Sequence, residues 1–419
     1  MDNTAGLQAG RITRLAGFLG IAEEIGTRIC NEAQWSGELC NWIGDTMAYE
    51  ESRWQVVRRT VGPTLYSGAS GIALFLAHLF RCAPEQTFRK TAEGAIGYVL
   101  SHVDKLSSAA NLGFYSGLTG LAYVLSEMAE AFGVQQLADQ SLAILRALSS
   151  IPVNPQQWDV VSGSAGMIPV LLKLHSRYGN QPLLDSALRH GDTLLQSASQ
   201  SEFGWSWSAG ESQPHNNLTG FAHGTAGVAW SLLELYDKTG CQRFFTAAQE
   251  AFRYERHWYN PAWENWPDFR TVPESGKPNN VVGWCHGACG IGLSRIRAFQ
   301  LLGDQDCQTE AKIAVHTTTR ALQGALSSRG NYSLCHGHCG NAELLLWAGD
   351  VLGDEASIAT VQQIASDAVQ KYSYEKNPWP CGVMNGGETP DLMLGLAGIG
   401  HFYLRLYDRQ KIPSVLLVF

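Results

Sequence analysis

A short turn motif recurs along most of the chain and constrains its fold more than any other feature. Gly-x-x-Gly followed by an apolar segment occurs seven times, at broadly similar intervals. The seven motifs are Gly68-Gly71, Gly117-Gly120, Gly163-Gly166, Gly224-Gly227, Gly287-Gly290, Gly337-Gly340 and Gly395-Gly398. Repeats at such intervals are typical of proteins in which one supersecondary unit stacks on the next. Seven similar units are therefore predicted.

Each unit is predicted to be a hairpin of two helices. After each glycine pair the sequence is apolar nearly all round, as in 72–77 and 228–233, which indicates a helix enclosed by protein. More amphipathic segments between the motifs indicate outer helices, at 88–104, 134–149, 183–199, 242–258, 308–323 and 356–372. No such hairpin can bury its apolar face alone, so the units are predicted to close into an all-α double ring of helices.

This arrangement predicts a single domain over residues 1–419, with the repeats at 61–408 and an outer helix within 1–60 that completes the ring. Glycine permits close approach of chain segments at the start of each inner helix, so the seven N-termini should gather around one pocket. The loops 200–217, 259–280 and 375–390 are rich in Pro, Gly or Trp. Such composition predicts ordered surface loops, which would grip a substrate if they overhang the pocket.

Charge and apolar runs limit the partners and the compartment. The net charge is −8, which argues against a nucleic-acid or anionic-membrane surface, because both require clustered Lys and Arg. The apolar run 15–22 is short and followed by Glu23 and Glu24, so no signal peptide or membrane span is expected. A cytoplasmic location is predicted. The ten cysteines are then expected to be buried thiols or metal ligands rather than disulfides.

Two of the seven turns carry the triplet Cys-His-Gly. Cys285-His286-Gly287 and Cys335-His336-Gly337 each precede an apolar segment, and they belong to successive repeats. A thiol at a helix N-terminus favours the thiolate, because unpaired amide N–H groups and the helix dipole stabilise negative sulfur. Two such sulfurs with neighbouring imidazoles supply the ligands that zinc prefers, provided that the two turns meet in space.

Several ligand sets are open at this point. A catalytic zinc ion needs three protein ligands, and Cys285 and Cys335 with one histidine are the natural choice. A closed structural site that also uses Cys289 and Cys339 is less natural, since each of these follows its partner by one helical turn. The alternative to any metal site is that these cysteines are small packed residues.

The fourth and third turns supply candidates for proton transfer. His223, in Ala222-His223-Gly224, occupies the position of the histidine in the two Cys-His-Gly triplets. Asp159 precedes the third turn and is expected to orient or charge this imidazole, as general acid–base chemistry requires. A lone histidine is more often a satisfied core residue, and the prediction for His223 therefore depends on its place on the pocket rim.

These residues resemble those of the lanthionine synthetase C-like (LanC-like) cyclase family. The resemblance rests on Trp284-Cys285-His286-Gly287, Leu334-Cys335-His336-Gly337, Ala222-His223-Gly224 and the seven glycine turns, over residues from about 60 to 408. The stretches 290–295, 340–345 and 394–400 are similar in particular to the cyclase domain of class II lanthipeptide synthetases. A free-standing cyclase or a cyclase domain cut from a larger chain would account for the absence of a dehydratase region here.

The resemblance implies an α/α toroid of seven inner and seven outer helices, with one Zn²⁺ on Cys285, Cys335 and His336. It also implies that His223 and Asp159 occupy the acid–base positions. The expected activity is addition of cysteine thiolates to dehydroalanine or dehydrobutyrine, which forms lanthionine or methyllanthionine rings in a dehydrated precursor peptide. A separate dehydratase is a further expected partner.

The chain departs from this family at one position. Single-function cyclases carry an arginine four residues before the first ligand cysteine, where this chain has Val281. The expected cationic contact is therefore missing or comes from elsewhere, and Arg295 is one candidate. The role of His286 also stays open between a contact with the enolate and simple packing.

Three other functions compete with the cyclase. One adds glutathione or another external thiol to dehydroamino acids, as some LanC-like proteins do. Another is a non-catalytic peptide-binding scaffold with structural zinc. The last is a carbohydrate-active α/α barrel, which requires a pair of carboxylates facing the pocket, whereas the turns offer only Asp159.

Overall fold

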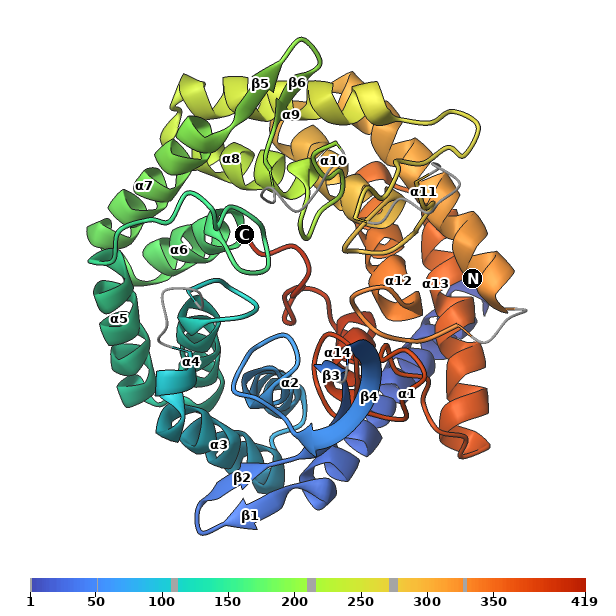
Figure 1. Cartoon of the computed structure of the whole chain (residues 1–419). Helices are drawn as coiled ribbons and strands as arrows, with labels where there is room; N and C mark the ends of the chain where they lie inside the picture. Colours follow the sequence, from blue (N-terminus) through green and yellow to red (C-terminus); the bar gives the residue numbers. More distant parts are fainter. Residues whose placement is uncertain (1, 51, 107–111, 209–215, 271–277, 327–329) are drawn as a thin grey trace.

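Two concentric circles of helices surround a common axis (Figure 1). The computed structural model describes residues 2–50, 52–106, 112–208, 216–270, 278–326 and 330–419. Within these residues the inner circle consists of α2 (Ala69–Cys82), α4 (Leu118–Phe132), α6 (Ser164–Tyr178), α8 (Thr225–Thr239), α10 (Ala288–Leu302), α12 (His338–Trp347) and α14 (Leu396–Tyr407). The outer circle consists of α1 (Asp2–Glu32), α3 (Gln86–Ser101), α5 (Gln135–Ser149), α7 (Gln181–Ser197), α9 (Gln242–Trp258), α11 (Gln305–Leu326) and α13 (Glu355–Ala368). The predicted double ring of helices is confirmed.

Burial separates the two circles as the sequence patterns predict. The first eleven residues of α8 are all buried, whereas α9 buries a stripe that includes Phe244, Ala247, Ala248 and Ala251. Each of the first six inner helices packs against the outer helix that follows it, and α14 packs against α1. The first helix of the chain thereby closes the outer circle. None of the described helices is both long and apolar enough to cross a bilayer.

Short hairpins add to the helices at places that the helical pattern did not predict. The strands are β1 (Gln34–Ser36), β2 (Leu39–Asn41), β3 (Ile43–Glu50), β4 (Arg53–Thr60), β5 (Ser199–Ser201) and β6 (Gly204–Ser206). They form three antiparallel pairs, so the segment before the first glycine motif holds two hairpins as well as the predicted outer helix. Irregular short segments also extend the helices, namely η1 (Val103–Lys105) and the π-helical turns η2 (Ala348–Leu352) and η3 (Val369–Tyr374).

A closed circle of backbone hydrogen bonds joins the seven turns in front of the inner helices. In each link the amide N–H of one turn donates to a carbonyl oxygen of the next turn, over donor–acceptor distances of 2.9 to 3.4 Å. The links are Tyr66 to Tyr115, Tyr115 to Val161, Val160 to Ala222, Ala222 to Cys285, Cys285 to Cys335, Cys335 to Met393 and Met393 to Tyr66. Residues far apart in the sequence therefore become neighbours at one end of the ring.

The second glycine of each motif is required by the tightness of these turns. An added Cβ at Gly290 would lie 2.0 Å from the carbonyl oxygen of Trp284, six residues earlier, and the same contact recurs in all seven motifs. Among the first glycines, Gly287 alone has a positive φ, 79°, which side chains other than glycine rarely adopt. Both features fix the path of the chain around Cys285.

The C-terminal segment lies inside the ring (Figure 1). Ile412 and Val415 to Val418 are at most 3% exposed. The hydroxyl of Tyr115 donates to the Val415 carbonyl at 2.5 Å, and the indole N–H of Trp284 donates to the Leu416 carbonyl at 3.1 Å. The segment thus fills the centre of the toroid directly beneath the turns that carry the candidate site.

Candidate functional site

Two thiols and one imidazole converge at the front of α10 and α12. One ligand atom from each of Cys285, Cys335 and His336 lies within 4.8 Å of the other two. The backbone link from Cys285 N to Cys335 O, 3.4 Å long, brings together two turns that lie far apart in the sequence. This donor set of two sulfurs and one nitrogen fits zinc, with a fourth position left for a substrate.

The orientation of His336 supports a role as ligand. Its Nε2 lies 3.0 Å from the carbonyl oxygen of Gly382. A carbonyl only accepts, so Nε2 carries the proton and Nδ1 is left with a lone pair. A histidine that binds a metal commonly donates its other N–H to such a carbonyl. Gly382 lies in the predicted loop 375–390, so this loop helps to orient the His336 ring.

The two thiols share one proton in the absence of a metal. The hydrogen bond from the Cys335 thiol lowers the pKa of Cys285 to about 7, with a further contribution from the charge of Arg270. The same bond raises the pKa of Cys335 well above its usual range. The pair therefore already stabilises one thiolate near neutral pH, which is the form that binds metals.

The other candidate ligands lie away from this group. The Cys289 thiol donates to the carbonyl of Gly340 at 3.5 Å, and burial raises the pKa of both Cys289 and Cys339. His338 packs edge-on against Tyr332, with ring centroids 4.7 Å apart. Within the described residues, the metal-binding group therefore contains two thiols rather than four.

His223 and Asp159 form the second part of the site. His223 Nδ1 lies 2.6 Å from Asp159 Oδ2, while Asp159 Oδ1 accepts the backbone N–H of Ser162 at 2.7 Å. Burial lowers the pKa of His223, but the hydrogen bond and charge of Asp159 outweigh this, so its pKa is raised from 6.5. With Nδ1–H directed at the carboxylate, Nε2 is available for proton transfer. The imidazole is 40% exposed.

A buried carboxylate holds the turn that carries His223. Glu255 Oε1 accepts the backbone N–H groups of Gly220 and Ala226, at 3.0 and 3.1 Å, so it ties both sides of the turn to α9. The side chain is fully buried, and burial raises its pKa to about 7. The position of the imidazole is therefore fixed from the outer circle of helices.

Two cavities meet at His223. The first, here called the sulfur cavity, has a volume of about 280 Å³, and its lining includes Tyr66, Trp284, Cys285, Cys335 and His223. The second, here called the far cavity, measures about 320 Å³ and is lined by Gln156, Gln157, Trp158, Asp159, Ser162, Leu218, His223 and Arg270. Asp159 is the only carboxylate among the described residues that line either cavity, and a glycosidase would need two.

Arg270, which the sequence patterns did not single out, is the cation of this site. It lies in the predicted loop 259–280 and lines the far cavity beside His223. Asp268, only 3% exposed, binds its guanidinium through Nε at 3.0 Å and Nη2 at 2.7 Å. Residues 271–277 of this loop and 209–215 of the loop 200–217 lie outside the described residues. The prediction that loops overhang the pocket could have directed attention to this arginine.

Arg295 does not supply the missing cation, and that suggestion was wrong. Its side chain is 0% exposed, pairs with Glu310 and stacks on the ring of Phe252 at 4.1 Å. It lies within α10, where the helix buries it against α9 and α11 rather than toward the cavities. A residue in the second turn of an inner helix faces the packed wall, because that helix is enclosed on all sides.

Two further residues border the site. The phenol of Tyr66 hydrogen-bonds to the Cys335 thiol, and this bond offsets part of the rise in the pKa of that thiol. The ring of His286 lies 6.0 Å from that of His223, and its Nδ1 is 3.9 Å from Asp268 Oδ1. Both ring nitrogens of His286 are buried without a hydrogen-bond partner among the described residues.

Comparisons with known proteins find relatives in sequence and a similar fold among solved structures. The nisin biosynthesis protein NisC of Lactococcus lactis subsp. lactis is 24% identical over 309 residues, which cover 67% of this chain and 72% of the relative. The glutathione S-transferase LANCL1 of Danio rerio is 24% identical over 371 residues, 84% of each chain. The solved structure of nisin cyclase superposes with a TM-score of 0.64 at 18% identity, covering 85% of this chain and 92% of that one.

The family itself follows from a longer match. The family described as lanthionine synthetase C-like protein matches residues 59–417. The finer similarity to class II synthetases stays a prediction. Because the family match spans well over half of the sequence and the toroid is that of nisin cyclase, the chain belongs to the lanthionine synthetase C-like family.

Proposed function

We propose that this protein joins cysteine thiols of a dehydrated precursor peptide to its dehydroalanine or dehydrobutyrine residues, which forms thioether rings. The observation that carries the proposal is the convergence of Cys285, Cys335 and His336 beside a His–Asp pair that borders two cavities. Cys285, Cys335 and His336 would hold one Zn²⁺. When bound there, zinc would keep the incoming thiol as a nucleophilic thiolate at neutral pH.

The protein's own residues account for the movement of the proton. His223 Nε2 accepts the proton of the substrate thiol, and Asp159 holds the resulting imidazolium through Nδ1. The sulfur forms a bond to the β-carbon as the C=C π electrons move toward the neighbouring carbonyl. His223 then returns the proton to the α-carbon, so the reaction consumes no further reagent. A separate dehydratase would supply the unsaturated residues.

The wider family supports a second candidate in which the thiol comes from outside the peptide. The observation in its favour is that the relative from Danio rerio, which aligns with 84% of this chain, is named a glutathione S-transferase. The same site would then hold glutathione in the sulfur cavity and a dehydrated protein residue in the far cavity.

Mass spectrometry separates these two reactions. A dehydrated peptide that contains one cysteine is incubated with the enzyme, with and without glutathione, and then treated with a thiol-alkylating reagent. A cyclase protects the peptide cysteine from alkylation without a change in peptide mass. External addition leaves that cysteine free and adds the mass of glutathione. A peptide that is unchanged in both incubations contradicts both reactions.

Metal analysis tests the proposed ligands. The parent protein is expected to contain one zinc per chain, and Cys285→Ala to lose most of it, because two ligands cannot hold the ion at the same affinity. Cys289→Ala is the matched control, since this cysteine is buried one helical turn further on and donates to Gly340 instead. Equal zinc in the parent and Cys285→Ala proteins would contradict the assignment.

A further inference from the structure

The far cavity is lined differently from the sulfur cavity. Gln156, Gln157, Trp158 and Arg270 are among the residues that line it, whereas no cysteine of the described residues does. His223 lines both cavities, so one imidazole borders the space beside the thiols and the space beside Arg270. The arrangement separates a compartment for the nucleophile from a compartment for its partner.

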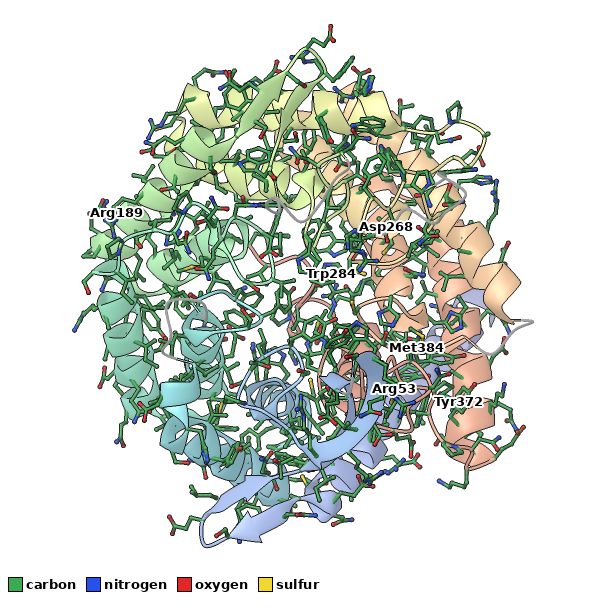
Figure 2. All side chains as sticks on the ribbon, in the orientation of Figure 1. Arg53, Arg189, Asp268, Trp284, Tyr372 and Met384 are labelled. Atoms are coloured by element: carbon green, nitrogen blue, oxygen red, sulfur yellow. The ribbon has the colours of Figure 1, made fainter. Side chains whose placement is uncertain are left out.

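Arg270 is held rigidly in this cavity. Asp268 binds one edge of the guanidinium and also accepts the backbone N–H of Arg270 at 3.0 Å. The backbone N–H of Asp268 donates to the carbonyl of Asn279 at 2.9 Å. Figure 2 shows Asp268 inside the ring of helices. These contacts use Nε and Nη2, while Nη1 makes no hydrogen bond to the described residues. A pre-oriented guanidinium nitrogen is therefore available for a ligand.

The charges of the site favour a neutral ligand with a strong acceptor oxygen. Asp268 balances Arg270, and Asp159 balances His223 when that imidazole is protonated. A free carboxylate would therefore meet little net attraction. An amide carbonyl fits better, because it is neutral on binding and gains negative charge only as the thiolate adds to the conjugated double bond.

We propose that the far cavity is the acceptor subsite, which takes the planar dehydroamino acid, and that Arg270 Nη1 donates a hydrogen bond to its carbonyl oxygen. The inference deepens the proposed function and rests on it. As the S–C bond forms, the C=C π electrons move onto this oxygen and give an enolate, which Arg270 stabilises. When His223 protonates the α-carbon, the carbonyl is restored and the contact weakens.

The proposal also gives the site a cation although the chain has Val281 where the family resemblance expects an arginine. This cation, Arg270, comes from the loop 259–280 and lines the far cavity beside His223. This loop is fastened to the His223 turn, since the hydroxyl of Thr219 donates to the carbonyl of Pro267 at 2.6 Å. Arg270 and His223 therefore keep a fixed relation.

Steady-state kinetics with a dehydrated peptide test this assignment. Arg270→Gln is expected to lower kcat about 100- to 1,000-fold, as removal of a donor to a developing oxyanion does, while KM changes less than about threefold. Arg270→Lys keeps the positive charge but lacks the planar guanidinium with its fixed N–H donors, and it should have about a tenth of the parent kcat or less. Zinc content is expected to stay near the parent value for both variants. Arg270→Gln should also lower the melting temperature, because Asp268 then lacks its partner in a buried place, and kcat is therefore compared per folded molecule.

Arg189→Gln is the matched control. Arg189 lies on α7 at the outer rim of the ring (Figure 2), where its side chain donates to the Ser149 carbonyl. Its kcat should equal that of the parent. Suppose that the parent forms rings and that Arg270→Gln has the parent kcat, or changes only in zinc content or in KM. The acceptor subsite is then wrong, while the proposed function stands. If the parent forms neither rings nor thiol adducts, both proposals are wrong.

Discussion

Two histidine–carboxylate pairs in this molecule have similar chemistry and opposite surroundings. His223 and Asp159, 2.6 Å apart, precede the N-terminal ends of α8 and α6 and are 40% and 20% exposed. His78 and Glu127, 3.1 Å apart, lie toward the C-terminal ends of α2 and α4 and are 0% and 1% exposed. Asp159 raises the pKa of His223, whereas burial lowers the pKa of His78 despite its carboxylate partner.

The difference arises from access and from the neighbours of each carboxylate. Asp159 has no cation of its own other than His223 among the hydrogen-bonded residues described, so the imidazolium balances its charge. Glu127 is already bound by Arg177 at 2.8 Å and lies 3.7 Å from Arg81, and His78 is therefore best neutral. A second imidazole, His401, contacts His78 Nδ1 at 3.2 Å. A His–carboxylate pair thus becomes a proton-transfer group at the rim and a structural contact in the core.

The largest expected effect is the loss of activity in His223→Asn. Removal of the acid–base group should lower the rate of thioether formation about 100- to 10,000-fold, with an unfolding free energy close to that of the parent because the side chain is partly exposed. Kinetics with the dehydrated peptide and chemical denaturation measure both. His78→Asn is the control and should show the reverse, a loss of about 1–3 kcal/mol in stability with normal activity per folded molecule. A His223→Asn variant that forms rings as fast as the parent would show that another group moves the proton.

A slightly smaller effect is expected when the core carboxylate is neutralised. Glu127→Gln leaves the guanidinium of Arg177 without its buried counter-charge, which should cost about 3 kcal/mol in unfolding free energy. Glu130→Gln is the matched control, because Glu130 binds the same arginine at 2.7 Å but is 45% exposed, and should cost less than about 1 kcal/mol. Urea denaturation compares the two. Equal losses would mean that the buried pair is no more structural than an exposed one.

The smallest expected effect concerns the pH dependence of the reaction, which the pair of His223 and Asp159 controls. Because Asp159 raises the pKa of His223, the imidazole must lose a proton at a higher pH before it can accept one from the substrate thiol. Asp159→Asn should therefore move the acidic limb of the pH–kcat/KM profile to lower pH, and reduce the rate near neutral pH about tenfold through poorer orientation. An acidic limb that stays in place would show that another group controls it.

Much of the fold follows from short-range patterns. The seven glycine motifs, the apolar inner segments and the amphipathic outer segments predicted the inner and outer helices, because helix burial leaves a local periodic record in sequence. The hairpins β1–β2 and β3–β4 escaped prediction, since each strand is too short or too exposed to leave a comparable pattern. The same limit applies to the C-terminal segment 408–419, whose place inside the ring depends on partners such as Tyr115 and Trp284.

In the candidate site, too, some features follow from local sequence patterns and others depend on contacts between distant residues. The sequence by itself determined which residue types stand in front of the inner helices, including Cys285, Cys335 and His223, because each occupies a fixed place in a repeated turn. Only the tertiary structure decided that Cys285 touches Cys335, that His336 presents Nδ1, and that Arg270 reaches the rim from a loop. These contacts join residues that no local pattern connects, and they exist because the closed circle of backbone hydrogen bonds fixes which turns are neighbours.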